Sequence, residues 1–172
     1  MRNLKLILIP NLFVVAILFS SCKGEHKEHE HKHDNDHQSK KEWNHEDHKS
    51  VKAAILDYVE GLYLADSTRI EKSVDSTLRK IGYWYNKKEK AWTDGSNMTY
   101  NQLVSLAARW NKDGSRVNEG TPKKIEIYDV NTRTASAKLT AAWGVDYFHL
   151  SKVNDQWKIM NVIWQSTPES KK

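Results

Sequence analysis

Histidine is the residue type whose placement in this sequence most clearly suggests chemistry. The chain contains eight His, and seven of them lie in one short tract: His26, His29, His31, His33, His37, His45 and His48. Neutral imidazole is a common ligand of zinc, copper and nickel, and clustered His indicate metal binding by composition. His29, His33 and His37 are spaced four residues apart, so a transient helix would place them on one face. The tract therefore predicts weak binding of these metals at several sites.

The segment that carries these His, residues 22–49, is predicted to be a tether. Trp43 is its only large apolar side chain. Such a segment cannot bury enough surface to offset the entropy lost on ordering, so we expect it to be disordered. A solvated spacer that holds a folded domain away from a membrane is the alternative to a metal-binding role. Neither interpretation requires a cofactor.

Cys22 is the only cysteine of the chain and follows a short apolar segment. The apolar run over residues 6–19 is shorter than the roughly 20 residues of a spanning helix, and it follows a positively charged start, as in a signal peptide. The two serines before the cysteine resemble a bacterial lipobox. This resemblance implies that residues 1–21 are a signal peptide and that Cys22 carries a lipid. An ordinary signal peptide with an incidental cysteine is the alternative.

The residue that follows Cys22 bears on where such a protein would be anchored. It is Lys23 and not Asp, which by resemblance to bacterial lipoprotein sorting implies the outer membrane. We therefore expect a lipid-anchored protein of the cell envelope that faces the periplasm or the cell surface.

The composition of the chain is that of one folded domain with appendages. Its 172 residues include seven Trp and seven Tyr, which predict an aromatic core. The net charge of +5 is scattered and forms no basic stripe, so we expect no nucleic-acid partner. A single cysteine excludes a disulfide framework.

Helical patterns dominate the first part of the folded domain, which we place at residues 50–167. The first helix is expected from Val51 to Ala65 because its apolar residues recur on one face. Thr68 with Glu71 has capping-box spacing and predicts a second helix. The third helix is predicted to start at Thr99, where the same spacing recurs with Gln102.

Strands are predicted around and after these helices. One strand is expected at residues 78–85 with a short return at 91–92, and four more are expected at residues 124–130, 134–142, 145–153 and 157–165. The connection near Trp143 is either a tight hairpin or a bulge. Residues 168–172 are a polar tail. This order predicts an α+β fold in which three N-terminal helices pack on a curved antiparallel sheet.

The last two strands are apolar at successive positions. Trp157, Ile159 and Ile163 alternate with Met160, Val162 and Trp164. In an antiparallel sheet with one solvent-exposed face, apolar and polar residues would alternate along each strand. We therefore expect the second face to meet another copy of the chain in a two-fold dimer.

Three stretches of this domain resemble the nuclear transport factor 2-like superfamily. They are residues 57–61 (DYVEG), 143–150 (WGVDYFHL) and 157–164 (WKIMNVIW), and they look like the branch labelled "putative lumazine-binding" in bacterial envelope proteins. The resemblance implies a cone-shaped, cystatin-like fold with a ligand cavity between the helices and the sheet. Because this fold hosts many activities, the resemblance implies the fold more strongly than the function.

Ketosteroid isomerase, a catalytic relative, implies roles for two residues. Tyr58 matches the tyrosine that donates to the developing oxyanion, and Asp146 matches the protonated aspartate that donates beside it. The stretch that matches the catalytic base is residues 80–83, which contains no acid. Proton abstraction needs a base, so the isomerase activity is not carried over.

The sequence therefore favours non-catalytic binding of a small, partly apolar molecule in the cone. Tyr58 and Asp146 are candidate ligand contacts, and Trp84, Trp110 and Trp164 are candidate aromatic walls. Two alternatives stay open. One is metal buffering by the His tract, and the other is a lyase or isomerase that uses Tyr58 and Asp146 with an unidentified base.

Overall fold

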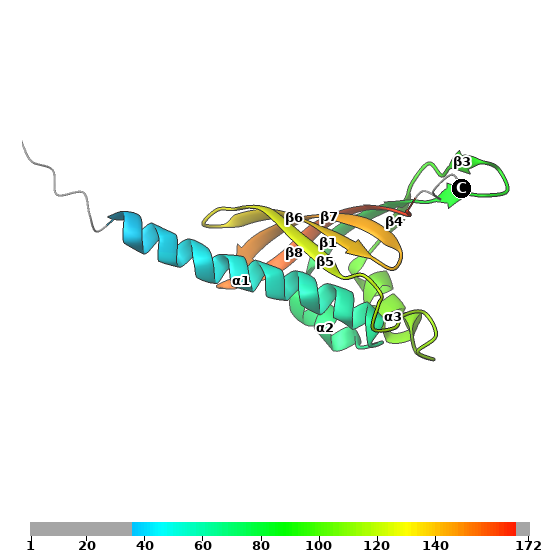
Figure 1. The fold of residues 1–172 in the computed structure, drawn as a ribbon, viewed down its shortest axis with the longest axis horizontal. Coiled ribbons are helices and arrows are strands. Elements are labelled where there is room, and N and C mark those ends of the chain that lie inside the picture. The colour runs from blue at the N-terminus through cyan, green and yellow to red at the C-terminus, as the bar shows by residue number, and fades with distance from the viewer. Residues whose placement is uncertain (1–35, 168–172) are drawn as a thin grey trace, which may run out of the picture. The chain divides into compact units, whose positions relative to one another are not determined.

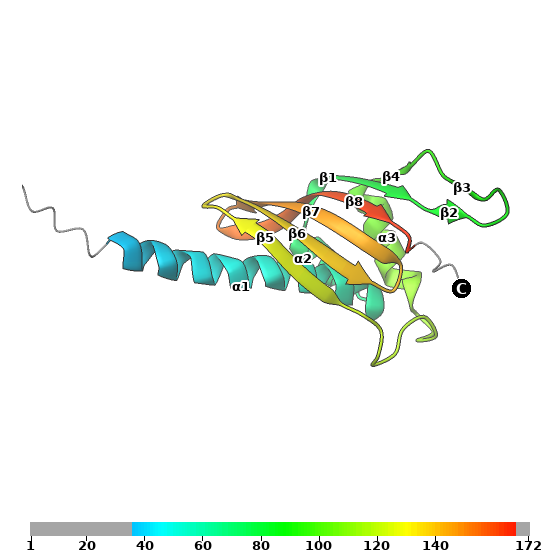
Figure 2. The ribbon, with the colours of Figure 1, turned by 45° about the horizontal axis from the view of Figure 1, so that its top comes forward.

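Three helices lie against one face of a sheet in this α+β fold (Figures 1 and 2). The computed structural model describes residues 36–167, with side chains described from His45 onward. Helix α1 spans Asp36–Tyr63, α2 spans Ser67–Ser73 and α3 spans Tyr100–Trp110. The expected signal peptide, the lipid on Cys22 and the polar tail lie outside the described residues.

The main sheet has six strands in the order β4-β1-β8-β7-β6-β5. Their bounds are Ser96–Met98 for β4, Val74–Tyr83 for β1, Gln156–Gln165 for β8, Gly144–Val153 for β7, Thr134–Ala141 for β6 and Lys124–Val130 for β5. Strand β1 runs parallel to β8, and every other pair is antiparallel. The expected antiparallel sheet is therefore mixed. A two-stranded ribbon of β2 (Tyr85–Asn86) and β3 (Ala91–Trp92) follows β1 and extends beyond the sheet (Figure 2).

Helix α1 begins earlier than the sequence predicted, so residues 36–49 are helical and not a disordered tether. Asp47 explains how this part is held. Its Oδ1 accepts hydrogen bonds from Lys152 Nζ at 2.7 Å and from Trp157 Nε1 at 2.9 Å, which ties the helix to β7 and β8. The predicted apolar face of α1 is confirmed, because Val51, Ala54, Ile55, Tyr58, Val59 and Leu62 are all buried. Within the part of the chain that the structure describes, no helix is long and apolar enough to span a membrane.

The starts of the two shorter helices test the predicted caps. The capping box at Thr99 is confirmed: its Oγ1 accepts from Gln102 N at 3.4 Å, and Gln102 Oε1 accepts from Thr99 N at 2.8 Å. The predicted box at Thr68 is wrong, because α2 is capped two residues earlier by Asp66. The Asp66 carboxylate accepts from Thr68 N at 3.0 Å. Asp66 has extended backbone dihedrals, as an N-cap requires.

The connection between β6 and β7 is a tight hairpin. Ala141 pairs with Gly144, which leaves Ala142 and Trp143 as the turn. Gly144 has φ +137°, and a Cβ at this position would lie 2.0 Å from the carbonyl oxygen of Gln165. Glycine is therefore required here both for its conformation and for the close approach of β8.

A β-bulge in β8 explains why the last strands looked apolar on both faces. His149 pairs with Asn161 and Leu150 pairs with Ile159, so Met160 is the extra residue. The alternation of core-facing and outward-facing side chains therefore shifts by one residue at this point. Residues on both sides of the bulge therefore share the core face, namely Trp157, Ile159, Val162 and Trp164, whereas Ile163 faces outward. The expectation that Ile163 shares a face with Trp157 and Ile159 is wrong for this reason.

The outward face of the sheet still carries apolar side chains. Tyr147 and Ile163 are paired across β7 and β8, and they are 48% and 45% exposed. Their row continues to Lys138 on β6, whose ammonium is 3.2 Å from the carboxylate of Glu126. The positive charge of Lys138, at the edge of the apolar pair Tyr147 and Ile163, is thus neutralised by Glu126. We propose that a second copy of the chain covers this face in a two-fold dimer.

Substituting Ile163→Lys should weaken this dimer at least about tenfold, because a cation would replace an apolar side chain in the buried interface. Size-exclusion chromatography with light scattering over a range of concentrations measures the change. Lys112→Glu, an exposed change in the loop after α3, is the control and should leave the dimer intact. A wild-type chain that stays monomeric at every concentration would contradict the proposal.

Candidate functional site

Tyr58, Lys80 and Asp146 meet inside the domain. Tyr58 lies on α1, Lys80 on β1 and Asp146 on β7. Tyr58 and Asp146 are fully buried, and Lys80 is only 6% exposed. We call these three residues, with Trp143 and Trp164, the cone cluster.

The sheet register explains why a lysine joins this cluster. Strands β1 and β7 flank β8 on opposite sides, with Lys80 opposite Val162 and Asp146 opposite Trp164. Two strand spacings amount to about 9–10 Å between backbones, which a short side chain cannot cross. The four-carbon stem of Lys80 carries its amine across β8 to the carboxylate.

Hydrogen bonds connect the polar atoms of the cone cluster. Lys80 Nζ donates to Tyr58 Oη at 2.6 Å and to Asp146 Oδ1 at 3.3 Å. Trp143 Nε1 donates to Asp146 Oδ2 at 2.6 Å. Both carboxylate oxygens of Asp146 therefore accept a bond. Among the described residues, no buried side-chain nitrogen or oxygen lacks a partner.

The Lys80 amine also faces two aromatic rings. Its Nζ lies 5.4 Å from the ring centroid of Tyr58 and 5.5 Å from that of Trp164. Trp164 in turn lies on Gly82, where a Cβ would come within 1.9 Å of the indole nitrogen. Glycine at position 82 therefore makes room for the indole beside Lys80. Cation–π attraction adds to the hydrogen bonds in holding the ammonium.

Burial controls the protonation of the cluster. It lowers the pKa of the Lys80 ammonium, and the charge of Asp146 opposes this shift only in part. Burial, and after it the charge of Asp146, raises the pKa of the Tyr58 hydroxyl well above its ordinary value. Tyr58 is thus a neutral phenol at neutral pH, and Lys80 releases its proton more readily than a surface lysine.

An aromatic wall adjoins the cluster at the β6–β7 hairpin. The Trp143 ring packs edge-to-face on Tyr58, Tyr63 and Trp110, with centroid separations of 6.3, 5.7 and 5.3 Å. Trp110 stacks on Tyr63 at 5.9 Å. The Tyr63 hydroxyl donates to the carbonyl of Pro122 at 2.6 Å and accepts from Ala142 N at 2.8 Å. This tyrosine therefore joins the helices to the loop before β5.

The structure brings together most of the predicted ligand-binding residues. Tyr58, Asp146 and Trp164 surround the Lys80 amine, and Trp110 reaches the cluster through Trp143. Trp84 does not join them. It precedes the β2–β3 ribbon and is 42% exposed. Its carbonyl accepts from Thr93 N, and its backbone N–H donates to Thr93 Oγ1.

Lys80 is the residue that sequence reasoning missed. The search for a base in residues 80–83 considered acids only, although a buried amine can also accept a proton. The sequence did contain a signal for Lys80. Lys80 lies two residues after Leu78 in the same strand, so both side chains point to the core. A lysine at an inward position needs a partner, and Asp146 supplies it.

The predicted metal ligands lie mostly outside the described side chains. His26, His29, His31 and His33 precede the described residues, and only the backbone of His37 is described. His45 and His48 lie on α1, where the ring of His45 is 3.7 Å from the Glu46 carboxylate. Within the described residues, no group of three or more His, Cys, Asp or Glu could hold a metal ion.

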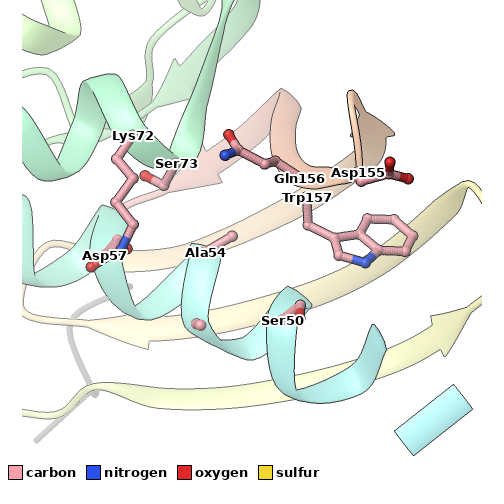
Figure 3. Close-up of a pocket in the computed structure, with 9 residues that line it drawn as sticks. Ser50, Ala54, Asp57, Lys72, Ser73, Asp155, Gln156 and Trp157 are labelled. Carbon is pink, nitrogen blue, oxygen red and sulfur yellow. The ribbon is translucent and has the colours of Figure 1, made fainter. Parts of the chain in front are cut away.

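A separate surface pocket of about 250 Å³ lies between α1, the end of α2 and the β7–β8 turn (Figure 3). Its lining residues are Ser50, Ala53, Ala54, Asp57, Lys72, Ser73, Asp155, Gln156 and Trp157. The Lys72 side chain points toward Asp57, and the ion pair measures 2.8 Å. Arg69 binds the other oxygen of the same carboxylate at 2.9 Å. The pocket shares no residue with the cone cluster, and the charge of Asp57 is neutralised by its own neighbours.

Helices on one face of a curved sheet, with a polar cluster between them, define a nuclear transport factor 2-like, cystatin-like fold. A nuclear transport factor 2-like protein of unknown function from Silicibacter pomeroyi has 14% identity and a TM-score of 0.51, covering 72% of this chain and 98% of its own. One from Novosphingobium aromaticivorans has 11% identity and a TM-score of 0.52, covering 81% of this chain and 94% of its own. These likenesses confirm the predicted fold class.

The family follows from the sequence itself. Residues 46–165 match the family described as putative lumazine-binding, and this chain belongs to that family. The match begins next to Asp47, the residue that anchors α1. No curated protein matches the sequence.

Substituting Asp146→Ala should lower the free energy of unfolding by about 3–5 kcal/mol, because the buried Lys80 amine would lose its carboxylate partner. The double variant Lys80→Met/Asp146→Leu should recover to within about 1 kcal/mol of the wild type, since apolar groups of similar volume leave no charge unpaired. Urea denaturation measures both. Glu119→Ala, at an exposed loop position, is the control. Equal losses in the single and double variants would contradict a coupled buried pair.

Proposed function

We propose that the domain binds a small, flat, partly apolar molecule non-catalytically beside Lys80, between α1 and the sheet. The observation that carries this proposal is a buried ammonium whose bond to its carboxylate is long. The distance between Lys80 Nζ and Asp146 Oδ1 is 3.3 Å, whereas the other two polar bonds of the cluster are 2.6 Å. This is the weakest polar bond of the cluster, so a ligand oxygen that accepted from Lys80 in place of Asp146 would disrupt the cluster least.

The surroundings of Lys80 suit a flat ligand with carbonyl groups. Trp143 and Trp164 are the partly exposed members of the cone cluster, so a ligand reaching Lys80 would contact indole rings. Aromatic walls and a few convergent polar groups are typical of small-molecule sites. The family description names lumazine, a flat bicyclic molecule with two carbonyl groups, and this supports a ligand of that chemical type.

Lumazine should bind the full chain saturably, and its own fluorescence reports the binding. The double variant Lys80→Met/Asp146→Leu should bind at least about tenfold more weakly, because it lacks the amine that would meet a carbonyl. Trp84→Ala, which removes an exposed tryptophan outside the cluster, is the matched control and should bind as the wild type does. Absence of saturable binding, or equal binding by the double variant, would contradict the proposal.

The location of the protein is also a proposal. We infer an envelope lipoprotein that is anchored through Cys22, supported by the apolar run of residues 6–19 and the small residues before the cysteine. A lipid on Cys22 would hold the ligand-binding domain at a membrane surface.

A second candidate function is the binding of zinc, copper or nickel by the His tract. One observation favours it: His45 and His48 lie one turn apart on α1, so both imidazoles project from the same side of a helix. Two imidazoles fixed in this way provide the start of a site that other His of the tract would complete.

Zinc titration of the full chain by calorimetry should show several weak sites. Replacing the seven His of the tract by Asn should abolish them, because Asn lacks the imidazole nitrogen that binds zinc. His149→Asn changes the eighth His, on the outer face of the sheet, and should leave the titration unchanged. Zinc binding that survives the sevenfold replacement would contradict this function.

A further inference from the structure

The geometry of the cone cluster points to a chemical role for Lys80 beyond holding a ligand. We propose that its ε-amine forms a reversible covalent bond, an iminium, with a ligand that carries an aldehyde or ketone group. This inference rests on the proposed function, because a small molecule must first reach the cone. It adds the chemical class of the ligand and a covalent mode of binding.

Three groups of the cluster match the needs of imine formation. The reaction needs an amine, a neutral acid that relays a proton to the carbonyl oxygen, and a carboxylate that accepts and returns a proton. Tyr58 Oη lies 2.6 Å from the Lys80 nitrogen, and Asp146 Oδ1 lies 3.3 Å from it. Both groups are therefore within proton-transfer distance of the reacting atom.

Trp143 fixes the orientation of the carboxylate. Its indole nitrogen binds Asp146 Oδ2 at 2.6 Å, which leaves Oδ1 for the amine. The indole ring itself packs edge-to-face against the stacked rings of Tyr63 and Trp110. Asp146 is thus positioned by a packed aromatic group and needs no rearrangement before it accepts a proton.

The state of the amine supports this role. An ammonium has no lone pair and cannot attack a carbonyl, and a hydrated surface lysine is almost wholly in that form at neutral pH. Burial lowers the pKa of Lys80 and so raises the fraction of neutral amine. The Tyr58 hydroxyl stays protonated, because its pKa is raised.

The proton inventory of the step balances. Asp146 accepts one proton from the Lys80 ammonium, and the free amine attacks the carbonyl carbon to form the C–N bond. Tyr58 takes a proton from that nitrogen while it gives its own to the former carbonyl oxygen, which produces a neutral carbinolamine. Asp146 then returns its proton to the hydroxyl, which leaves as water as the C=N bond forms. The sum is one carbonyl compound and one ammonium giving one iminium and one water.

The charge after the step equals the charge before it. The iminium carries the positive charge that the ammonium carried, so the Asp146 carboxylate keeps a cationic partner. The apolar side chains around the cluster, including Phe148 and Val162, limit the access of water that would hydrolyse the bond. The adduct is therefore stabilised by the same contacts that hold the free lysine.

Reductive trapping tests the inference. The full chain is incubated at pH 7 with benzaldehyde, a flat aromatic aldehyde, then treated with sodium cyanoborohydride and mapped by peptide mass spectrometry. Lys80 should be labelled at least about tenfold faster than the average of the surface lysines, and lumazine should slow this labelling by competing for the cone. Tyr58→Phe should slow it at least about tenfold, because the proton relay is lost.

Two variants serve as controls. Lys80→Arg keeps the buried charge but has no nucleophilic amine, so it should lose the fast label while circular dichroism shows a folded domain. Lys123→Arg removes a half-exposed lysine that pairs with Glu60 and should leave the fast label in place.

The outcomes separate the two proposals. If lumazine binds and needs the Lys80–Asp146 pair, but benzaldehyde labels only exposed lysines, covalent chemistry is overturned and non-covalent binding stands. If lumazine does not bind and Lys80 is unlabelled, both proposals fail. A fast label that persists in Lys80→Arg would assign the reactive amine to another lysine and overturn the inference.

Discussion

The ammonium of Lys80 lies inside the domain, and side chains from α1, β7 and β8 surround that charge. An unpaired buried cation is costly, and a pair is tolerated only when hydrogen bonds satisfy both members. Asp146 supplies the opposite charge from β7, and Tyr58 supplies a hydroxyl from α1. The contact therefore joins the N-terminal helix to strands that lie far from it in sequence.

The arrangement of strands around β8 meets this requirement. The parallel pairing of β1 with β8 places Lys80 on one side of that strand, and the antiparallel pairing with β7 places Asp146 on the other. The tight hairpin at Gly144 then places Trp143 three residues before Asp146, within reach of its second oxygen. Gly82 leaves space for Trp164 against the same amine. A helix and three strands thus meet at one nitrogen atom, and the turn supports the carboxylate beside it.

Local patterns predicted local structure well. The apolar face of α1 and the cap at Thr99 follow from side chains three or four residues apart, and the sequence contains both members of each contact. The family resemblance identified Tyr58 and Asp146 for the same reason, since each stands in a recognisable stretch. The single cap that was assigned wrongly, at α2, involved two adequate capping residues, Asp66 and Thr68, and only the backbone geometry chooses between them.

Long-range features escaped prediction because they depend on register. The bulge at Met160 shifts the inward phase of β8 by one residue, and no residue type in that strand signals it. The contact that ties the early part of α1 to the sheet joins Asp47 to Lys152 and Trp157, which lie about a hundred positions later. Lys80 was overlooked because its meaning comes from Asp146 on a strand that is not its neighbour. A polar residue at an inward strand position therefore implies a distant partner, but the sequence alone does not identify that partner.

The chemistry of the cluster differs from what folding alone would require. Elsewhere between the helices and the sheet, the same strands fill the space with apolar groups such as Phe148, Leu150 and Ile159. Such groups would serve as well at positions 80 and 146, because a buried ion pair rarely stabilises a fold more than apolar residues of the same volume do. The domain instead places an amine, a phenol and a carboxylate together where two partly exposed tryptophans adjoin the interior. Buried polar groups that folding does not require tend to occur at functional sites. This argues that the cone cluster is the functional part of the domain.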